Sequence, residues 1–147
     1  MPINDATVID ASNIILGRLA SIVAKRLLSG EKIIVVNAEK AVISGNKKNI
    51  FEEAMKRLEI RTLGSKTKSP KHYRRPDGLV RKTIRGMLPW DKSKGKEAYR
   101  MLKVYIGIPK SLNDVIPQTL PEASLTNIRA SLISVGDVAK SIGWDSS

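Results

Sequence analysis

Residues 6–36 read ATVIDASNIILGRLASIVAKRLLSGEKIIVV, and this stretch decides the fold class. The segment Ala6–Ala11 is mostly apolar and β-branched, which predicts a short strand. Apolar side chains then recur three or four residues apart, which predicts an amphipathic helix with Asn13 as its N-cap and Gly30 as its terminator. Ile33–Val36 is continuously β-branched, as is typical of a strand buried on both faces. A strand, a helix and a strand in this order favour an α/β fold. The helical stripe consists of Leu16, Leu19, Ala20, Val23 and Leu27.

The segments that follow extend this pattern without an internal repeat. Ala41–Ser44 is consistent with a further short strand, and Asn46 is suited to cap a helix over Lys47–Arg61. Lys96–Leu102 has modest helical character, and Lys103–Gly107 is typical of a strand. We therefore expect a largely parallel sheet with helices packed on it.

The C-terminal part of the chain is less regular. Three prolines predict that residues 108–133 form an extended, irregular arm. Ser134 and Asp137 match a capping box, which predicts a short final helix. A chain of 147 residues suits one domain, and we expect residues 1–147 to form a single domain.

The composition excludes several classes of protein. The chain has no cysteine and one histidine, His72, so disulfides, thiol nucleophiles and cysteine-based zinc or iron–sulfur sites are excluded. Its longest apolar runs are far shorter than the roughly 20 residues of a membrane-spanning helix. The N-terminal sequence also lacks the basic start of a secretory signal. We therefore expect a cytoplasmic protein with no membrane partner.

Positive charge is concentrated in one segment, residues 61–96, which we call the basic insert. It holds 12 basic and two acidic residues, a net charge of +10, whereas the rest of the chain has a net charge of +2. Charges this dense repel one another until an anionic partner neutralises them. The insert also carries flat side chains that can stack on bases, namely those of His72, Tyr73 and Trp90. Because no amphipathic helix is expected in the insert, nucleic acid is favoured over a membrane surface.

No residues are arranged for catalysis. The first strand and helix lack the three glycines of a dinucleotide-binding turn, and Leu63–Thr67 lacks the order of a phosphate-binding loop. His72 has no carboxylate nearer in sequence than Asp77, so we expect it to contact RNA or to make a structural hydrogen bond rather than act as a base. No metal, cofactor or small-molecule substrate is expected. An enzyme acting on RNA or nucleotides remains the alternative function.

Residues 84–107, IRGMLPWDKSKGKEAYRMLKVYIG, resemble the signature of the universal ribosomal protein L13 family of the large ribosomal subunit. The segments VIDASNIILGRLAS and KIIVVNAEKAVISGNK are similar to the first two segments of that family. His72–Pro76, HYRRP, resembles its archaeal and eukaryotic branch, and the absence of a long C-terminal helical extension favours the archaeal one.

The resemblance implies a fold and a function. The fold would be a three-layer α/β/α sandwich with a four-stranded, mostly parallel sheet, to which the basic insert is added. The protein would be a structural constituent of the large ribosomal subunit that binds its ribosomal RNA, supports assembly, and contacts neighbouring ribosomal proteins. Such proteins contact the shape and backbone of RNA more than its sequence. The candidate RNA-binding residues are Arg18, Lys66, Lys68, Lys71, His72, Tyr73, Arg74, Arg75, Arg81, Lys82, Arg85, Gly86, Lys92, Lys94 and Lys96.

The two halves of the insert are expected to behave differently. Gly64–Gly78 contains no aliphatic side chain, so little burial offsets the entropy of ordering it, and we expect it to be mobile without RNA. Val80–Pro89 is expected to be anchored to the body, by which we mean the part of the chain outside the basic insert. Within it, Met87 and Leu88 would face the body and Arg85 the RNA, while Gly86 would let backbone approach backbone.

Overall fold

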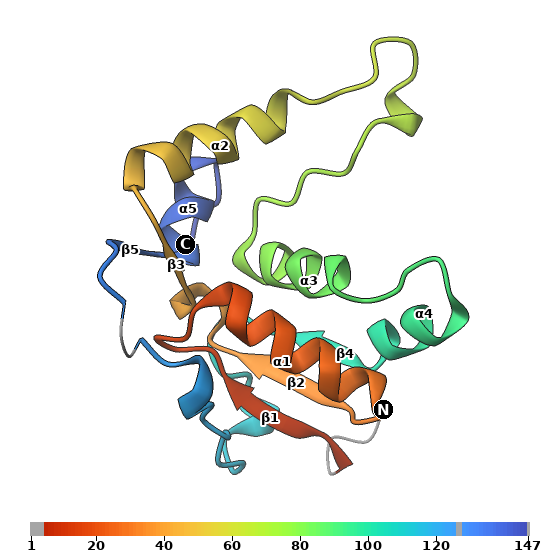
Figure 1. Ribbon diagram of the computed structural model, residues 1–147, viewed down its shortest axis with the longest axis vertical. Helices are drawn as coiled ribbons and strands as arrows, with labels where there is room; N and C mark the ends of the chain where they lie inside the picture. The colour runs from red at the N-terminus through yellow and green to blue at the C-terminus, as the bar shows by residue number, and fades with distance from the viewer. Residues whose placement is uncertain (1–4, 126–127, 147) are drawn as a thin grey trace.

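The first strand, helix and strand form the centre of the molecule. The computed structural model describes residues 5–125 and 128–146. Strand β1 (Thr7–Asp10) leads to helix α1 (Leu16–Leu28), and strand β2 (Ile33–Val36) runs parallel to β1 with Thr7 opposite Ile33. The expected α/β class is confirmed (Figure 1). Strand β2 is buried on both faces as expected.

The main sheet has three strands in the order β1-β2-β4, all parallel. Strand β4 (Leu102–Val104) pairs with β2 so that Leu102 lies opposite Ile33. It begins one residue earlier and ends sooner than expected, although the Tyr105 N–H still donates to the Val35 carbonyl at 2.8 Å. The helix before it, α4 (Ser93–Arg100), likewise begins three residues before the expected Lys96.

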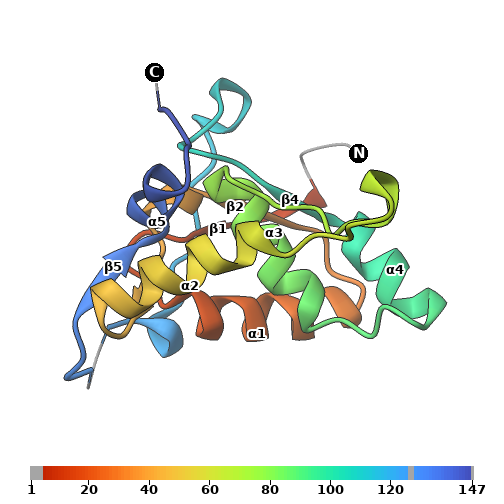
Figure 2. The same ribbon diagram turned by 90° about the horizontal axis from the view of Figure 1, so that it is seen from above.

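The two faces of this sheet are covered differently. On one face, Ile9, Ile33 and Val35 pack against α1 and against α3 (Pro76–Gly86). On the other face, Val8, Ile34 and Val36 pack on Leu112 of the C-terminal arm. Figure 2 shows α1 on one side of the sheet and the loop after β4 on the other. The second cover is therefore irregular chain and a short 3-10 turn, not a layer of α-helices.

The expected fourth strand of the main sheet is not confirmed, because the described strands form one three-stranded and one two-stranded sheet. Strand β3 (Val42–Ser44) is not part of the main sheet. It pairs antiparallel with β5 (Leu132–Ser134), with Ile43 opposite Ile133. Three-residue strands have too little alternation to show their partners in the sequence. Of the arm expected over residues 108–133, the described residues before β5 include two 3-10 turns and no α-helix, residues 126–127 lie outside the described residues, and residues 132 and 133 belong to β5.

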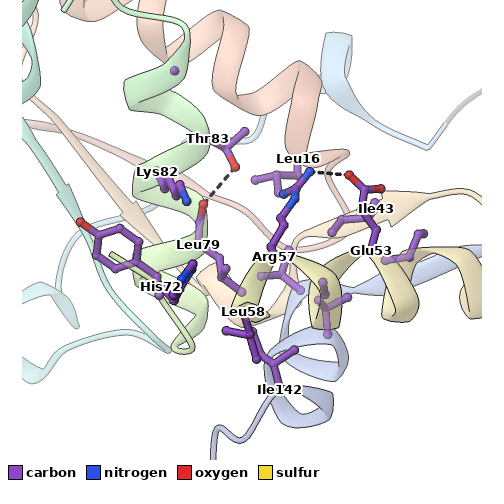
Figure 3. A pocket seen from close by; sticks show the side chains of 16 residues that line it. Leu16, Ile43, Glu53, Arg57, Leu58, His72, Leu79, Lys82, Thr83 and Ile142 are labelled. Carbon is purple, nitrogen blue, oxygen red and sulfur yellow. Dashed lines mark hydrogen bonds and ion pairs between the residues drawn. The ribbon is translucent and has the colours of Figure 1, made fainter. Parts of the chain in front are cut away.

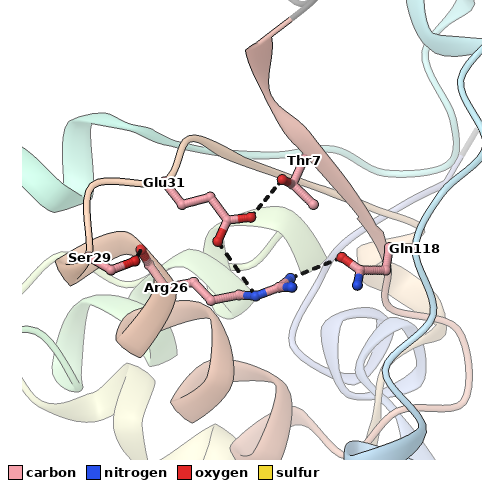
Figure 4. Close-up of polar contacts among 5 residues, drawn as sticks. All are labelled: Thr7, Arg26, Ser29, Glu31 and Gln118. Atoms are coloured by element: carbon pink, nitrogen blue, oxygen red, sulfur yellow. Dashed lines mark hydrogen bonds and ion pairs between the residues drawn. The ribbon is translucent and has the colours of Figure 1, made fainter.

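The arm is fastened along the outer edge of β1. The backbone N–H of Gln118 donates to the Val8 carbonyl at 2.7 Å, and the Asp10 N–H donates to the Gln118 carbonyl at 3.1 Å. Figure 4 shows the side chains around this contact. Arg26 of α1 donates to the Gln118 side chain at 3.1 Å and pairs with Glu31, which accepts a hydrogen bond from Thr7. One polar network thus joins α1, β1 and the arm.

Two of the three predicted helix caps are confirmed. The Asn46 side chain accepts from the N–H of Lys48 at the start of α2 (Lys47–Glu59), and Ser134 accepts from Asp137 at the start of α5 (Val135–Ser141). The prediction for Asn13 is wrong. Asn13 has φ +56°, a turn conformation that asparagine tolerates, and α1 begins three residues later with no side-chain cap. The shorter 3-10 turns are η2 (Ala38–Lys40), η3 (Lys66–Lys68), η4 (Lys110–Leu112) and η5 (Pro121–Ala123).

A polar pair of one buried and one partly buried residue lies at the carboxyl ends of β1 and β2. Asn37, which follows β2 and is 6% exposed, donates from its side chain to Asp10 at 3.0 Å. The Ser12 N–H donates to the same carboxylate at 2.9 Å. Partial burial raises the pKa of Asp10, but the hydrogen bonds from Ser12 and Asn37 and the charge of Lys40 outweigh it, so that its pKa lies below the ordinary value.

Candidate RNA interface

The second half of the basic insert is a helix that belongs to the core. Helix α3 has Val80 and Ile84 fully buried among the residues that pack on α1, while Arg81 and Lys82 are exposed. The expectation that no amphipathic helix runs through the insert is wrong. Helix α3 has three aliphatic residues, Leu79, Val80 and Ile84, beside four charged ones, so its apolar stripe is short and hard to see in the sequence. Burial of one face makes α3 a rigid support for the cations on the other.

The prediction for the segment after α3, that Met87 and Leu88 face the body, is correct for only one of the two residues. Leu88 is buried, so it is anchored as predicted, whereas Met87 is 44% exposed and does not face the core. Apart from its own helix, no described atom lies within 4 Å of a Cβ atom placed on Gly86, so the close backbone approach expected there is not found among the described residues. Its open side is left for a partner, which keeps its contact with RNA a prediction.

Aromatic rings order two of the arginines on α3. The Arg85 guanidinium lies 4.0 Å from the centroid of the Trp90 ring, and the Arg81 guanidinium lies 5.1 Å from that of Tyr99. The two rings meet edge to face, with centroids 5.3 Å apart and planes at 86°. Cation–π contacts of this kind hold arginine side chains in place. The insert was predicted to end at residue 96, so Tyr99 on α4 was missed from the sequence. The one sequence signal that could have pointed to Tyr99 is that it follows Trp90 by nine residues.

The first half of the insert is an exposed loop tied back to itself and to α2. The Thr62 N–H donates to the Ser69 hydroxyl at 2.9 Å, which in turn donates to the Ser65 carbonyl at 3.3 Å. His72 Nε2 lies 2.7 Å from the Ile60 carbonyl. Since a carbonyl oxygen only accepts, Nε2 is the donor. The structural hydrogen bond that the sequence left open for His72 is therefore present, and contact between His72 and RNA remains a prediction.

The predicted RNA-binding residues lie mostly on the surface. Arg18 lies apart from the insert, on α1, and its guanidinium donates to the Ser124 carbonyl at 3.3 Å. His72 and Arg85 are half-buried, the latter against Trp90. The remaining candidates are exposed: Lys66, Lys68, Lys71, Tyr73, Arg74, Arg75, Arg81, Lys82, Gly86, Lys92, Lys94 and Lys96.

Two hollows adjoin this surface and share His72 and Tyr73. The first, of about 390 Å³, is mainly apolar and lies between α2, α3 and α5, where Leu58, Leu79 and Ile142 point into it (Figure 3). The second, of about 340 Å³, is lined mainly by charged and aromatic residues and lies between residues 72–75, the start of α3 and Tyr99. We call the second hollow the basic cleft. It is lined by His72, Tyr73, Arg74, Arg75, Asp77, Gly78, Arg81 and Tyr99.

Neither a metal site nor a membrane-spanning helix is found among the described residues. Within residues 5–125 and 128–146, no three histidine, cysteine or acidic side chains gather where they could hold a metal ion. Over the same residues, none of the helices has the length and apolar character needed to cross a membrane.

Comparison with known proteins identifies the family. Residues 4–111 match the model of the family described as ribosomal protein L13. The chain is 43% identical over 143 residues to the large ribosomal subunit protein uL13 of Archaeoglobus fulgidus, which covers 96% of this chain and 90% of that protein.

Two further proteins of the same name show similar agreement. That of Methanococcoides burtonii is 46% identical over 138 residues, 93% of this chain and 97% of its own length. That of Methanocaldococcus jannaschii is 52% identical over 107 residues, 72% of this chain and 78% of its own length. These relatives come from archaea, in agreement with the branch that HYRRP suggested. The chain belongs to the ribosomal protein L13 family.

Proposed function

We propose that the protein is a structural constituent of the large ribosomal subunit, in the cytoplasm, where it binds ribosomal RNA and supports assembly of the subunit. The observation that carries this proposal is that the family of the chain and the charge on its surface both indicate a role in binding ribosomal RNA. The relatives are named as large-subunit proteins, and the insert with a net charge of +10 exposes most of its lysines and arginines. Family membership favours this role over the alternative of an enzyme acting on RNA or nucleotides.

The basic insert is the proposed RNA-binding surface. Its exposed lysines and arginines neutralise phosphate, and the ordered pairs Arg85–Trp90 and Arg81–Tyr99 present guanidinium groups at fixed positions. Arg18 on α1 is a separate proposed RNA contact outside the insert. Exposed apolar side chains outside the insert, such as Met55 and Ile60 at the α2 end, are suited to contact neighbouring ribosomal proteins.

Residues 1–147 are proposed to act as one domain. The support is a shared core, in which Ile9 of β1, Ile84 of α3 and Val135 of α5 belong to one cluster of buried side chains. We also infer that the arm at Gln118, which pairs with β1 in parallel, occupies the position of the fourth strand in the sandwich that the family resemblance implies.

The test is the salt dependence of binding to large-subunit ribosomal RNA. If six to eight cations of the insert meet phosphate, at roughly −0.7 per contact, the slope of log K against log salt is about −4 to −6. A transcript of the large-subunit RNA, the purified full chain and a filter-binding series between low and moderate salt measure it. A slope flatter than about −2 would show that the insert is not the main RNA-binding surface. Cosedimentation of the native protein with large subunits tests the location.

A further inference from the structure

We propose that the basic cleft holds one unpaired nucleotide of RNA, with its base on Tyr73 and its flanking phosphates on the arginines. This inference rests on the proposed function and deepens it, because it names the part of the RNA that the cleft takes. The cleft volume of about 340 Å³ falls within the range of small-ligand sites. The inference rests on the exposed ring of Tyr73 and on the guanidinium groups of the arginines that line the cleft.

The ring of Tyr73 is the stacking surface. Helix α3 supports it from behind, since a Cβ atom on Gly78 would lie only 2.9 Å from Tyr73 Cδ1. Lys82 Nζ lies 6.0 Å from the ring centroid, and Tyr73 is 39% exposed. The ring is therefore held in one place while part of it remains open to the cleft, as a platform for an unstacked base requires.

The arginines of the cleft are oriented before any ligand arrives. Arg81 lies over the Tyr99 ring, and Arg75 Nε lies 3.4 Å from Asp77 Oδ1. The Gly78 N–H also donates to Asp77, at 2.9 Å, which fixes that carboxylate. Side chains already held in place lose less conformational entropy when they bind phosphate. With Arg74, the lining carries three guanidinium groups against one carboxylate, so an anionic ligand is favoured.

The chemistry selects a single-stranded nucleotide over other anions. Paired RNA presents phosphates and 2′-hydroxyls but hides the faces of its bases, so it would leave the Tyr73 ring unused. An acidic peptide segment of a neighbouring protein would pair with the arginines but would gain little from the ring. An unpaired nucleotide satisfies both parts of the cleft, because it carries a flat base and phosphates on either side.

Phe51 provides a matched control for Tyr73. Each ring has a lysine above it, Lys47 at 5.5 Å for Phe51 and Lys82 at 6.0 Å for Tyr73, but Phe51 lies on α2 and does not line the cleft. The experiment compares the wild-type chain with Tyr73→Leu, Tyr73→Phe and Phe51→Leu. Each protein is titrated against the large-subunit RNA transcript at several salt concentrations, and its thermal unfolding is measured.

Loss of one base–ring stack weakens binding by about 5- to 150-fold. We expect this loss for Tyr73→Leu, with an unchanged salt slope because no cation is removed, and wild-type affinity for Tyr73→Phe and Phe51→Leu. Affinity of Tyr73→Leu within about twofold of wild type would overturn the inference and leave the proposed function intact; that is also the result expected if a peptide occupies the cleft. A loss shared by Tyr73→Phe or by Phe51→Leu would overturn it as well. Failure of the wild-type chain to bind the transcript would instead refute the proposed function.

A second variant keeps the test decisive if Tyr73→Leu does not fold. Gly78→Ala favours the helical state of α3, since alanine is the better helix former, but its methyl group displaces the Tyr73 ring. We expect Gly78→Ala to lose affinity for the transcript by several-fold or more while α3 stays folded. Wild-type affinity of this variant would show that the position of the ring does not matter, which would overturn the inference.

Discussion

Gly95 lies so close to Pro89 that a Cβ atom on Gly95 would be 2.1 Å from the Pro89 carbonyl oxygen. The same carbonyl accepts a hydrogen bond from the Lys92 N–H at 3.1 Å, and the Gly95 N–H donates to the Lys92 carbonyl at 3.2 Å. The turn that carries Trp90 is thus folded tightly against α4. This contact gives a physical reason for the glycine in the segment that resembles the family signature.

Replacing Gly95 by alanine should destabilise the protein by about 1–3 kcal/mol, because the methyl group overlaps backbone that cannot move without opening the turn. Urea unfolding measures the change. Gly86→Ala is the control, since its methyl group would enter open space, and its free energy of unfolding should stay within about 1 kcal/mol of wild type. Equal stability of the two variants would contradict the close approach.

Truncation of Ile84 should cost about 2–5 kcal/mol, the usual range for a large aliphatic side chain removed from a core. Ile84 is fully buried, whereas Met87 three residues later is 44% exposed. Ile84→Ala should therefore lower the midpoint of urea unfolding strongly and Met87→Ala only slightly. Similar small effects for both would mean that α3 is not part of the core in solution.

Alanine at Arg74 and Arg75 should weaken RNA binding without unfolding the protein. Both side chains are exposed, and the pair between Arg75 and Asp77 is largely open to solvent, so each change should alter stability by about 0.5 kcal/mol or less. Binding to the large-subunit transcript should fall, and the salt slope should become less steep by about 0.7 per lost phosphate contact. A large drop in melting temperature with unchanged binding would assign these arginines a structural role.

Acid should destabilise the fold through Asp10. Its pKa is lowered in the folded protein, so the carboxylate contributes stability above its unfolded pKa, near 4, and this contribution is lost as the pH falls through the lower folded pKa. Asp10→Asn removes this titration. The difference in free energy of unfolding between wild type and Asp10→Asn should be larger at pH 7 than at pH 2.5. A difference that does not change with pH would rule out the effect.

Amide hydrogen exchange should separate the two halves of the basic insert. Residues 64–75 have few backbone hydrogen bonds to the body and should exchange quickly in the free protein and slowly in assembled subunits. Amides in the second half of α3, around Ile84, should be protected in both. The mobile half ends before Pro76 rather than at Gly78, because Pro76 is buried and begins α3. Strong protection of residues 64–75 without RNA would reveal a packing partner for them.

Local pattern was sufficient for the elements whose residues carry the signal themselves. The stripe from Leu16 to Leu27 and the β-branched run Ile33–Val36 specified helix and strand, because every third or fourth residue, or every residue, is apolar. The charge of the insert also depends only on composition, and composition alone is enough to indicate an anionic partner.

The tertiary structure decided what depends on contacts between distant residues. Strands β3 and β5 are three residues long and separated by most of the chain, so only packing selects their antiparallel pairing. The basic cleft likewise combines Tyr73 and Tyr99 at α3, whose face with Val80 and Ile84 is buried while Arg81 lies over the Tyr99 ring. Sequence by itself determined the charged segment and the helices and strands with a strong local pattern, since these follow from neighbouring residues, but it did not reveal α3 or β5. The pairing of short strands and the assembly of the cleft required the fold, because their energies come from surfaces that meet only after the chain has packed.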